Sequence, residues 1–148
     1  DALAWVEELR RLGLDVLVNE HRMLAIGQAR LQVAGVTDFS ARSTLRRHAS
    51  DPAKALAGAS ASSFRLLLAH QPKSIYAARK LGGDLQLSGH THAGQIPPMD
   101  LIVKLYFDYP WGLYQLGESY IYTTCGTGTW SPPMRLFSRN EIVEFVLL

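Results

Sequence analysis

The chain has 148 residues and a formal net charge of +2, and 47% of its residues are hydrophobic. This composition is sufficient for a buried core and excludes a disordered chain, while so small a charge gives no argument for nucleic acid as a partner. The single cysteine, Cys125, excludes an internal disulfide, and we interpret it as a small hydrophobic residue rather than a nucleophile. No run approaches the ~18 apolar residues of a membrane span.

The beginning of the chain predicts a helix and then a strand meander. Ala2–Leu12 has an apolar residue at every third position and is followed by Gly13, which is typical of an amphipathic helix with a left-handed cap. The predicted strands that follow are Asp15–Val18, Met23–Ile26 and Ala29–Val36. Two histidines of this half, His21 and His48, lie in polar stretches and are predicted to be surface residues.

The middle of the chain predicts a strand–helix–strand unit. Asp51 and Pro52 are typical of a helix start, and that helix is predicted to run to Ala59. Phe64–Ala69 is a continuous apolar run, as expected for a strand buried on both faces. A helix is then predicted from Pro72 to the glycines at 82–83, followed by the short strand Asp84–Ser88.

The last third of the chain predicts a β-rich end. Tyr114–Leu116 and Tyr120–Thr124 are predicted to form a hairpin around a three-residue loop, 117–119. Two closing strands are predicted at Arg135–Phe137 and Ile142–Leu147. For the aromatic cluster we favour core packing over a hydrophobic lid or a membrane-facing patch; its members are Tyr106, Phe107, Tyr109, Trp111 and Tyr114. The overall prediction is a mixed α/β fold.

Three histidines carry the chemistry of the sequence. His70 follows the apolar strand, and His90 and His92 follow the next strand between Gly89 and Gly94. Because a strand–helix–strand unit makes its strands parallel, their carboxyl ends should meet at one edge of the sheet. Neutral imidazoles gathered there would form a transition-metal site, and two ligands leaving one glycine-flanked loop suit a pair of adjacent ions.

The run Leu68-Ala69-His70-Gln71-Pro72, a helix, and Gly89-His90-Thr91-His92-Ala93-Gly94-Gln95 together resemble the calcineurin-like metallophosphoesterases, in particular their bacterial and often membrane-anchored branch. The resemblance implies an α/β fold, the C-terminal half of a four-layer α/β/β/α sandwich with mixed sheets. It also implies that residues 1–148 are the C-terminal part of one such domain, because the family's three earlier motifs are absent.

The resemblance implies roles for individual residues. His70 and His90 would bind one divalent ion and His92 its neighbour, the ions being Mn, Zn or Fe, and the ions would activate a water for in-line attack on a phosphoester. The catalytic acid histidine is expected upstream of Asp1, so we expect this chain alone to be inactive and its metal occupancy to be partial or nil. The expected substrates are phosphodiesters or lipid-linked phosphates.

The sequence also contains secondary candidates, of which the resemblance places the turn at 126–128 near the rim of the site. Gly126 and Gly128 are candidates for backbone contacts with phosphate, and Arg135 is either a substrate ligand or a surface arginine. Asp38, after another strand end, is either a residue supporting the metal ligands or a loop cap.

Two other functions compete with the phosphoesterase. One is a non-catalytic protein-interaction scaffold with the same fold, and the other is an amidohydrolase, which the late position of the His-x-His motif disfavours. We also expect the chain to self-associate through the apolar surface of a half-domain. Any membrane association is expected to come from a segment before Asp1.

Overall fold

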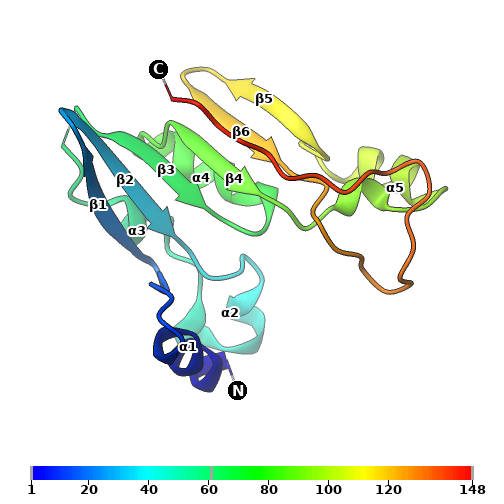
Figure 1. Cartoon of the computed structure of the whole chain (residues 1–148), viewed down its shortest axis with the longest axis horizontal. Helices are drawn as coiled ribbons and strands as arrows, with labels where there is room; N and C mark the ends of the chain where they lie inside the picture. Colours follow the sequence, from blue (N-terminus) through cyan, green and yellow to red (C-terminus); the bar gives the residue numbers. More distant parts are fainter. Residues whose placement is uncertain (1, 61, 148) are drawn as a thin grey trace.

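Six strands form one mixed sheet in the computed structural model, which describes residues 2–60 and 62–147. They are β1 (Glu20–Ile26), β2 (Ala29–Gly35), β3 (Phe64–Leu68), β4 (Leu85–Ser88), β5 (Gly112–Leu116) and β6 (Ser119–Thr123). Their order is β1-β2-β3-β4-β6-β5, in which β2, β3, β4 and β6 are parallel and the edge strands β1 and β5 are antiparallel to their neighbours (Figure 1). The predicted α/β class with a mixed sheet is confirmed.

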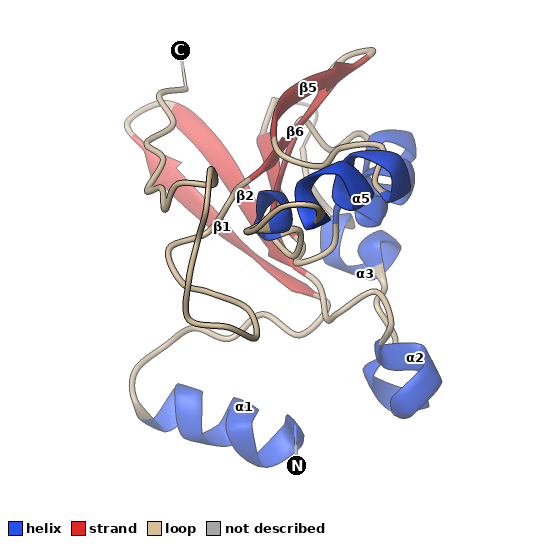
Figure 2. Ribbon diagram, turned by 90° about the vertical axis from the view of Figure 1, so that its right-hand side faces the viewer, coloured by secondary structure: helices blue, strands red, loops and turns tan. Residues whose placement is uncertain are grey.

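The helices are short, and two of them cover one face of the sheet. They are α1 (Ala2–Arg11), α2 (Ala41–Thr44), α3 (Pro52–Leu56), α4 (Ile75–Ala78) and α5 (Met99–Tyr106). The Asp51 carboxylate caps α3 as predicted, accepting a hydrogen bond from the Lys54 N–H at 2.9 Å. Helix α1 lies apart from the sheet at one end of the molecule (Figure 2). Within the described residues, no helix has the length and apolar character that crossing a bilayer requires.

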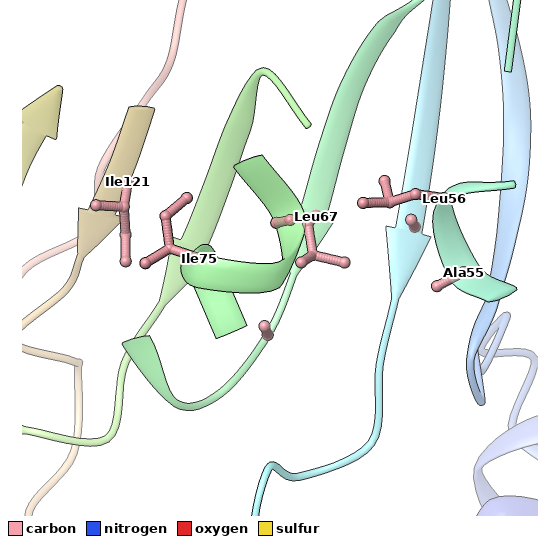
Figure 3. Close-up of a cluster of buried hydrophobic side chains, with 8 residues drawn as sticks. Ala55, Leu56, Leu67, Ile75 and Ile121 are labelled. Carbon is pink, nitrogen blue, oxygen red and sulfur yellow. The ribbon is translucent and has the colours of Figure 1, made fainter. Parts of the chain in front are cut away.

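The core lies between the sheet and the helices α3 and α4. Leu67 of β3 and Ile121 of β6 are fully buried there, against Ile75 of α4 and Leu56 of α3 (Figure 3). Burying one such side chain completely stabilises a fold by about 1.5–3 kcal/mol. Strand β4 lies between β3 and β6 and pairs in parallel with β3, and the site depends on that placement.

The opposite face of the sheet, which we call the open face, is also apolar. Side chains alternate along β3, so Leu66 and Leu68 point away from Leu67, and Leu68 keeps 40% of its surface exposed. The C-terminal segment 142–147 runs along this face, where the Phe145 ring lies 5.2 Å from that of Tyr122. A sheet that is apolar on both faces fits a fragment of a layered sandwich.

Several predicted boundaries were wrong. Asp15–Val18 is not a strand: this segment passes over the sheet, and a Cβ at Gly35 would lie 2.6 Å from that of Leu17. Arg135–Phe137 and Ile142–Leu147 are not strands. The Leu136 N–H donates to the Gln95 carbonyl oxygen in the histidine loop at 2.9 Å, and the Phe145 ring packs on Tyr122. The β5–β6 loop has two residues, since Leu116 pairs with Ser119. Helix α3 ends at Leu56 rather than at Ala59.

The two histidines predicted on the surface are partly or fully buried. His21 lies on β1, with its Nδ1 2.9 Å from the carbonyl oxygen of Ala55, and His48 is only 9% exposed. Of the aromatic cluster, Tyr109 and Tyr114 pack against the core as predicted, whereas Tyr106 is 78% exposed.

Candidate metal centre

The strand–helix–strand unit brings His70 against His90. Strands β3 and β4 pair in parallel, and the ladder continues past their ends, where the Gly89 N–H donates to the His70 carbonyl oxygen at 3.0 Å. Across that bond, His70 Nε2 lies 3.3 Å from His90 Nδ1, and the two rings meet edge to face with centroids 5.0 Å apart. The predicted meeting of these two histidines at one sheet edge is confirmed.

The separation of these two nitrogens fits a shared metal ion. Tetrahedral Zn²⁺ with Zn–N bonds of about 2.0–2.1 Å places two nitrogen ligands about 3.3–3.4 Å apart. The observed 3.3 Å between His70 Nε2 and His90 Nδ1 matches that spacing, and it also suits one proton shared between the rings. Within residues 2–60 and 62–147, no group of three or more His, Cys, Asp or Glu side chains is arranged to hold a metal ion. The described residues therefore place two facing imidazole nitrogens at this sheet edge.

The loop that carries His90 and His92 has an unusual backbone. His90, His92, Ala93 and Gln95 all have positive φ, between 50° and 74°, a region that costs most non-glycine residues about 1–2 kcal/mol each. The Thr91 hydroxyl supports the turn by donating to the Pro110 carbonyl at 2.5 Å. Strain of this kind gathers at sites where side chains must point in set directions.

Both histidines of the loop favour the neutral form that binds metals. Burial, and then the nearby His70 ring, hold the pKa of His90 below its ordinary value. Burial, and then the Arg135 guanidinium, lower the pKa of His92. Neutral imidazoles present a nitrogen lone pair to a metal without first releasing a proton.

His92 faces an arginine rather than the histidine pair. Its Nδ1 lies 3.3 Å from an Arg135 Nη2 atom, and a guanidinium only donates, so Nδ1 must be the acceptor and Nε2 must carry the proton. His92 still lines the same cavity as His70 and His90. Binding of a metal through Nε2 would require this ring to change its tautomer and its contact with Arg135.

Arg135 binds a ring of carbonyl groups. It donates to the carbonyl oxygens of Cys125 at 2.6 Å and Gly128 at 2.5 Å, and to that of His92 at 3.4 Å. A Cβ at Gly126 would lie 3.8 Å from His92 Nδ1, so this glycine abuts the site. Gly126 and Arg135 thus lie beside His92, and the Gly128 carbonyl belongs to the same hydrogen-bond network around Arg135.

Asp38 supports the histidine edge from a neighbouring loop. Its carboxylate accepts a hydrogen bond from the Ser40 N–H at 2.8 Å, just before α2, and another from Gln71 Nε2 at 3.0 Å. Gln71 directly follows His70. Burial opposes ionisation, but the bonds from Ser40 and Gln71 and the nearby His70 outweigh it and lower the Asp38 pKa. The loop-cap role weighed for Asp38 is visible in its bond with the Ser40 N–H, and its hydrogen-bonded link to the histidine edge runs through Gln71.

Known proteins similar to this chain share one description. It is 37% identical to the zebrafish "Transmembrane protein with metallophosphoesterase domain", covering 99% of this chain and 35% of that protein. It is 40% identical to an "Uncharacterized metallophosphoesterase" of Helicobacter pylori, covering 95% of this chain and 37% of that protein. No family model matches the chain.

The chain belongs to the calcineurin-like metallophosphoesterase family. It spans about a third of the length of these curated relatives, and membership implies dependence on a divalent metal. The expected restriction to a bacterial branch is not confirmed, because zebrafish and cattle proteins are among the relatives.

Two residues that organise this metallophosphoesterase segment received no role from sequence reasoning. Gln95 is 3% exposed, and its amide accepts from the Trp130 N–H at 2.6 Å and donates to the carbonyl oxygens of Trp130 at 2.8 Å and Pro132 at 3.0 Å. Glu141 accepts from the Thr124 hydroxyl and the Cys125 N–H, both at 2.8 Å. The position of Gln95, directly after the glycine that closes the histidine loop, was the available signal. Nothing local marked Glu141.

Hydrogen bonds also set the charge of Glu141. Burial opposes ionisation, but the bonds from Cys125, Thr124 and Tyr122 outweigh it and lower the Glu141 pKa. Burial first, and then the hydrogen bond to the Glu141 carboxylate, raise the pKa of Tyr122 to about 12. Glu141 thus stays ionised and ties the C-terminal segment to the end of β6.

Proposed function

We propose that the protein containing this segment is a two-metal phosphoesterase that hydrolyses phosphodiesters or lipid-linked phosphates. The observation that supports this most is the 3.3 Å separation of His70 Nε2 and His90 Nδ1, which suits two ligands of one ion. His92 is proposed to bind the neighbouring ion after exchanging its contact with Arg135. When bound, divalent ions such as Mn, Zn or Fe supply Lewis acidity to the phosphoryl oxygens and lower the pKa of a water.

The remaining parts of the proposed reaction are divided between this chain and the rest of the protein. The strained loop fixes the directions of His90 and His92, so binding an ion requires little further ordering of their backbone. Gly126 and Gly128 are proposed to form the rim at the phosphate, and Arg135 to hold that rim and to approach the substrate from it. The catalytic acid is proposed to be a histidine outside these residues.

Variants of the full-length protein test the proposal. We expect His70→Ala and His90→Ala to lower Mn²⁺-dependent hydrolysis of bis(p-nitrophenyl) phosphate by at least about 100-fold. His21→Gln is the matched control, because His21 is a half-buried histidine on β1, bonded to Ala55 and outside the site. Hydrolysis that survived His90→Ala would contradict the proposal.

Metal titration of this chain alone supplies a second test. We expect one weak Zn²⁺ site that is lost in both His70→Ala and His90→Ala, since the nitrogens of these two histidines face each other. Tight binding at two sites would contradict that expectation.

A non-catalytic scaffold is the second candidate function, and the Arg135 contact with His92 is the observation that favours it. The Arg135 guanidinium donates to His92 Nδ1, so this nitrogen is not free to bind a metal ion. A full-length protein that binds no Mn²⁺ or Zn²⁺ and hydrolyses no phosphoester, yet retains its fold, would support the scaffold instead.

A further inference from the structure

The cavity that contains the three histidines has a second, apolar half. Its volume is about 390 Å³, which is within the range of small-molecule sites. The three histidines and the polar residues Thr91 and Gln95 line it together with a set of apolar residues, which we call the apolar wall: Met99, Val103, Phe107 and Trp130. The side chains of the apolar wall carry no charge, so water gains few hydrogen bonds beside them.

Helix α5 is joined closely to the histidine loop. Met99, Val103 and Phe107 recur every four residues along α5 and its end, so they share one face. Val103 is 7% exposed, and the Phe107 ring meets the His90 ring with centroids 5.6 Å apart. A Cβ at Gly94 would lie 2.2 Å from the Asp100 backbone nitrogen, so only glycine lets the helix approach this closely. The apolar wall and the metal ligands therefore keep a fixed relation.

Trp130 is the fourth residue of the apolar wall. Its backbone is held in place although its side chain is exposed. Its indole side chain keeps much of its surface in water, with the residue 64% exposed. The Gln95 amide nevertheless fixes its backbone through both the N–H and the carbonyl group, at 2.6 and 2.8 Å. A large aromatic ring positioned over a cavity stands to gain by being covered with an apolar group.

The apolar surface continues beyond this cavity. A second hollow of about 440 Å³ lies along α5 and shares Met99, Val103 and Phe107 with the first. It adds Ile102, Tyr106 and one charged residue, Lys73. An extended apolar path that begins at the histidines suits a long chain better than a compact ring.

We propose that this path binds the hydrocarbon chain of a substrate whose phosphate lies at the histidines, so that the preferred substrates are phosphoesters of long-chain alkyl or acyl compounds. The inference rests on the proposed function for its phosphoryl end alone. The hydrocarbon end follows from the walls formed by α5 and Trp130.

Binding of soluble alkylphosphonates to this chain tests the inference. Methyl-, butyl-, hexyl- and octylphosphonate are titrated, with and without Zn²⁺, in a Trp5→Phe, Trp111→Phe background in which Trp130 is the only tryptophan. We expect affinity to rise about two- to fourfold per methylene, the gain expected from burying hydrocarbon, and Trp130 emission to shift to shorter wavelength. A flat series would overturn the inference.

Two further variants locate the binding site. We expect Phe107→Ala to flatten the chain-length dependence, whereas the control Leu105→Ala, on the same helix but 85% exposed and outside both hollows, keeps it. Circular dichroism checks that each variant is folded, and a steep series retained in folded Phe107→Ala would place the chain elsewhere and overturn the inference. Failure of the proposed function would give a different result. Zn²⁺ would then raise the affinity for octylphosphonate no more than it raises the affinity for octanol, while affinity would still increase with chain length.

Discussion

Replacing Gln95 with alanine should release the segment that carries Trp130. The amide makes three hydrogen bonds, to the Trp130 N–H and to the carbonyl oxygens of Trp130 and Pro132, at 2.6–3.0 Å. Each such bond stabilises a fold by about 0.5–1.5 kcal/mol net. Since Gln95 is 3% exposed, its truncation also leaves a small void, and we expect a total loss of about 2–4 kcal/mol.

The measurement should separate local release from global unfolding. Urea denaturation gives the change in the free energy of unfolding. Amide hydrogen exchange at Trp130 reports on the Gln95 hydrogen bonds themselves, and there we expect about 10–100-fold faster exchange in Gln95→Ala. Gln115→Ala is the matched control, because the exposed Gln115 side chain donates to the nearby Gly117 carbonyl oxygen on the surface. Its loss should change stability by no more than about 0.5 kcal/mol. Unchanged stability together with unchanged exchange at Trp130 would refute the reasoning that Gln95 holds this segment in place.

Three other changes give independent checks. Gly94→Ala should destabilise the chain by more than about 3 kcal/mol in urea, because the new Cβ would overlap the Asp100 backbone, whereas Gly117→Ala, with positive φ but open space, should cost about 1–2 kcal/mol. The pKa of Glu141 is lowered in the folded chain, so its contribution to stability is present above the pKa of the unfolded chain and is lost as pH falls through the folded value. The free energy of unfolding of Glu141→Gln should therefore be lower than that of the wild-type chain at pH 7 and should fall less between pH 5 and pH 3. The chain should self-associate through the open face, and Leu68→Lys should weaken this association; a wild-type chain that sediments as a monomer at high concentration would contradict it.

Local pattern was sufficient for the centre of the molecule. The apolar run Phe64–Ala69 and the strand before His90 are each short and bounded by helix signals, and a strand–helix–strand unit has essentially one arrangement. That arrangement places the carboxyl ends of both strands together, so the contact between His70 and His90 followed from the sequence without knowledge of the rest of the fold. The Asp51 cap of α3 was equally local.

Only the tertiary structure decided what surrounds the histidines. The partners of Gln95 lie 35 and 37 residues away, Arg135 reaches back 43 residues to His92, and Glu141 joins the end of β6 from a loop that was predicted to lie between strands. These contacts join side chains to distant backbone groups or to distant side chains, and such pairs leave no periodicity in the sequence. The same physics explains the wrong closing strands: an apolar run there lies along a sheet face and packs by its side chains, so alternation alone did not reveal whether its backbone would pair.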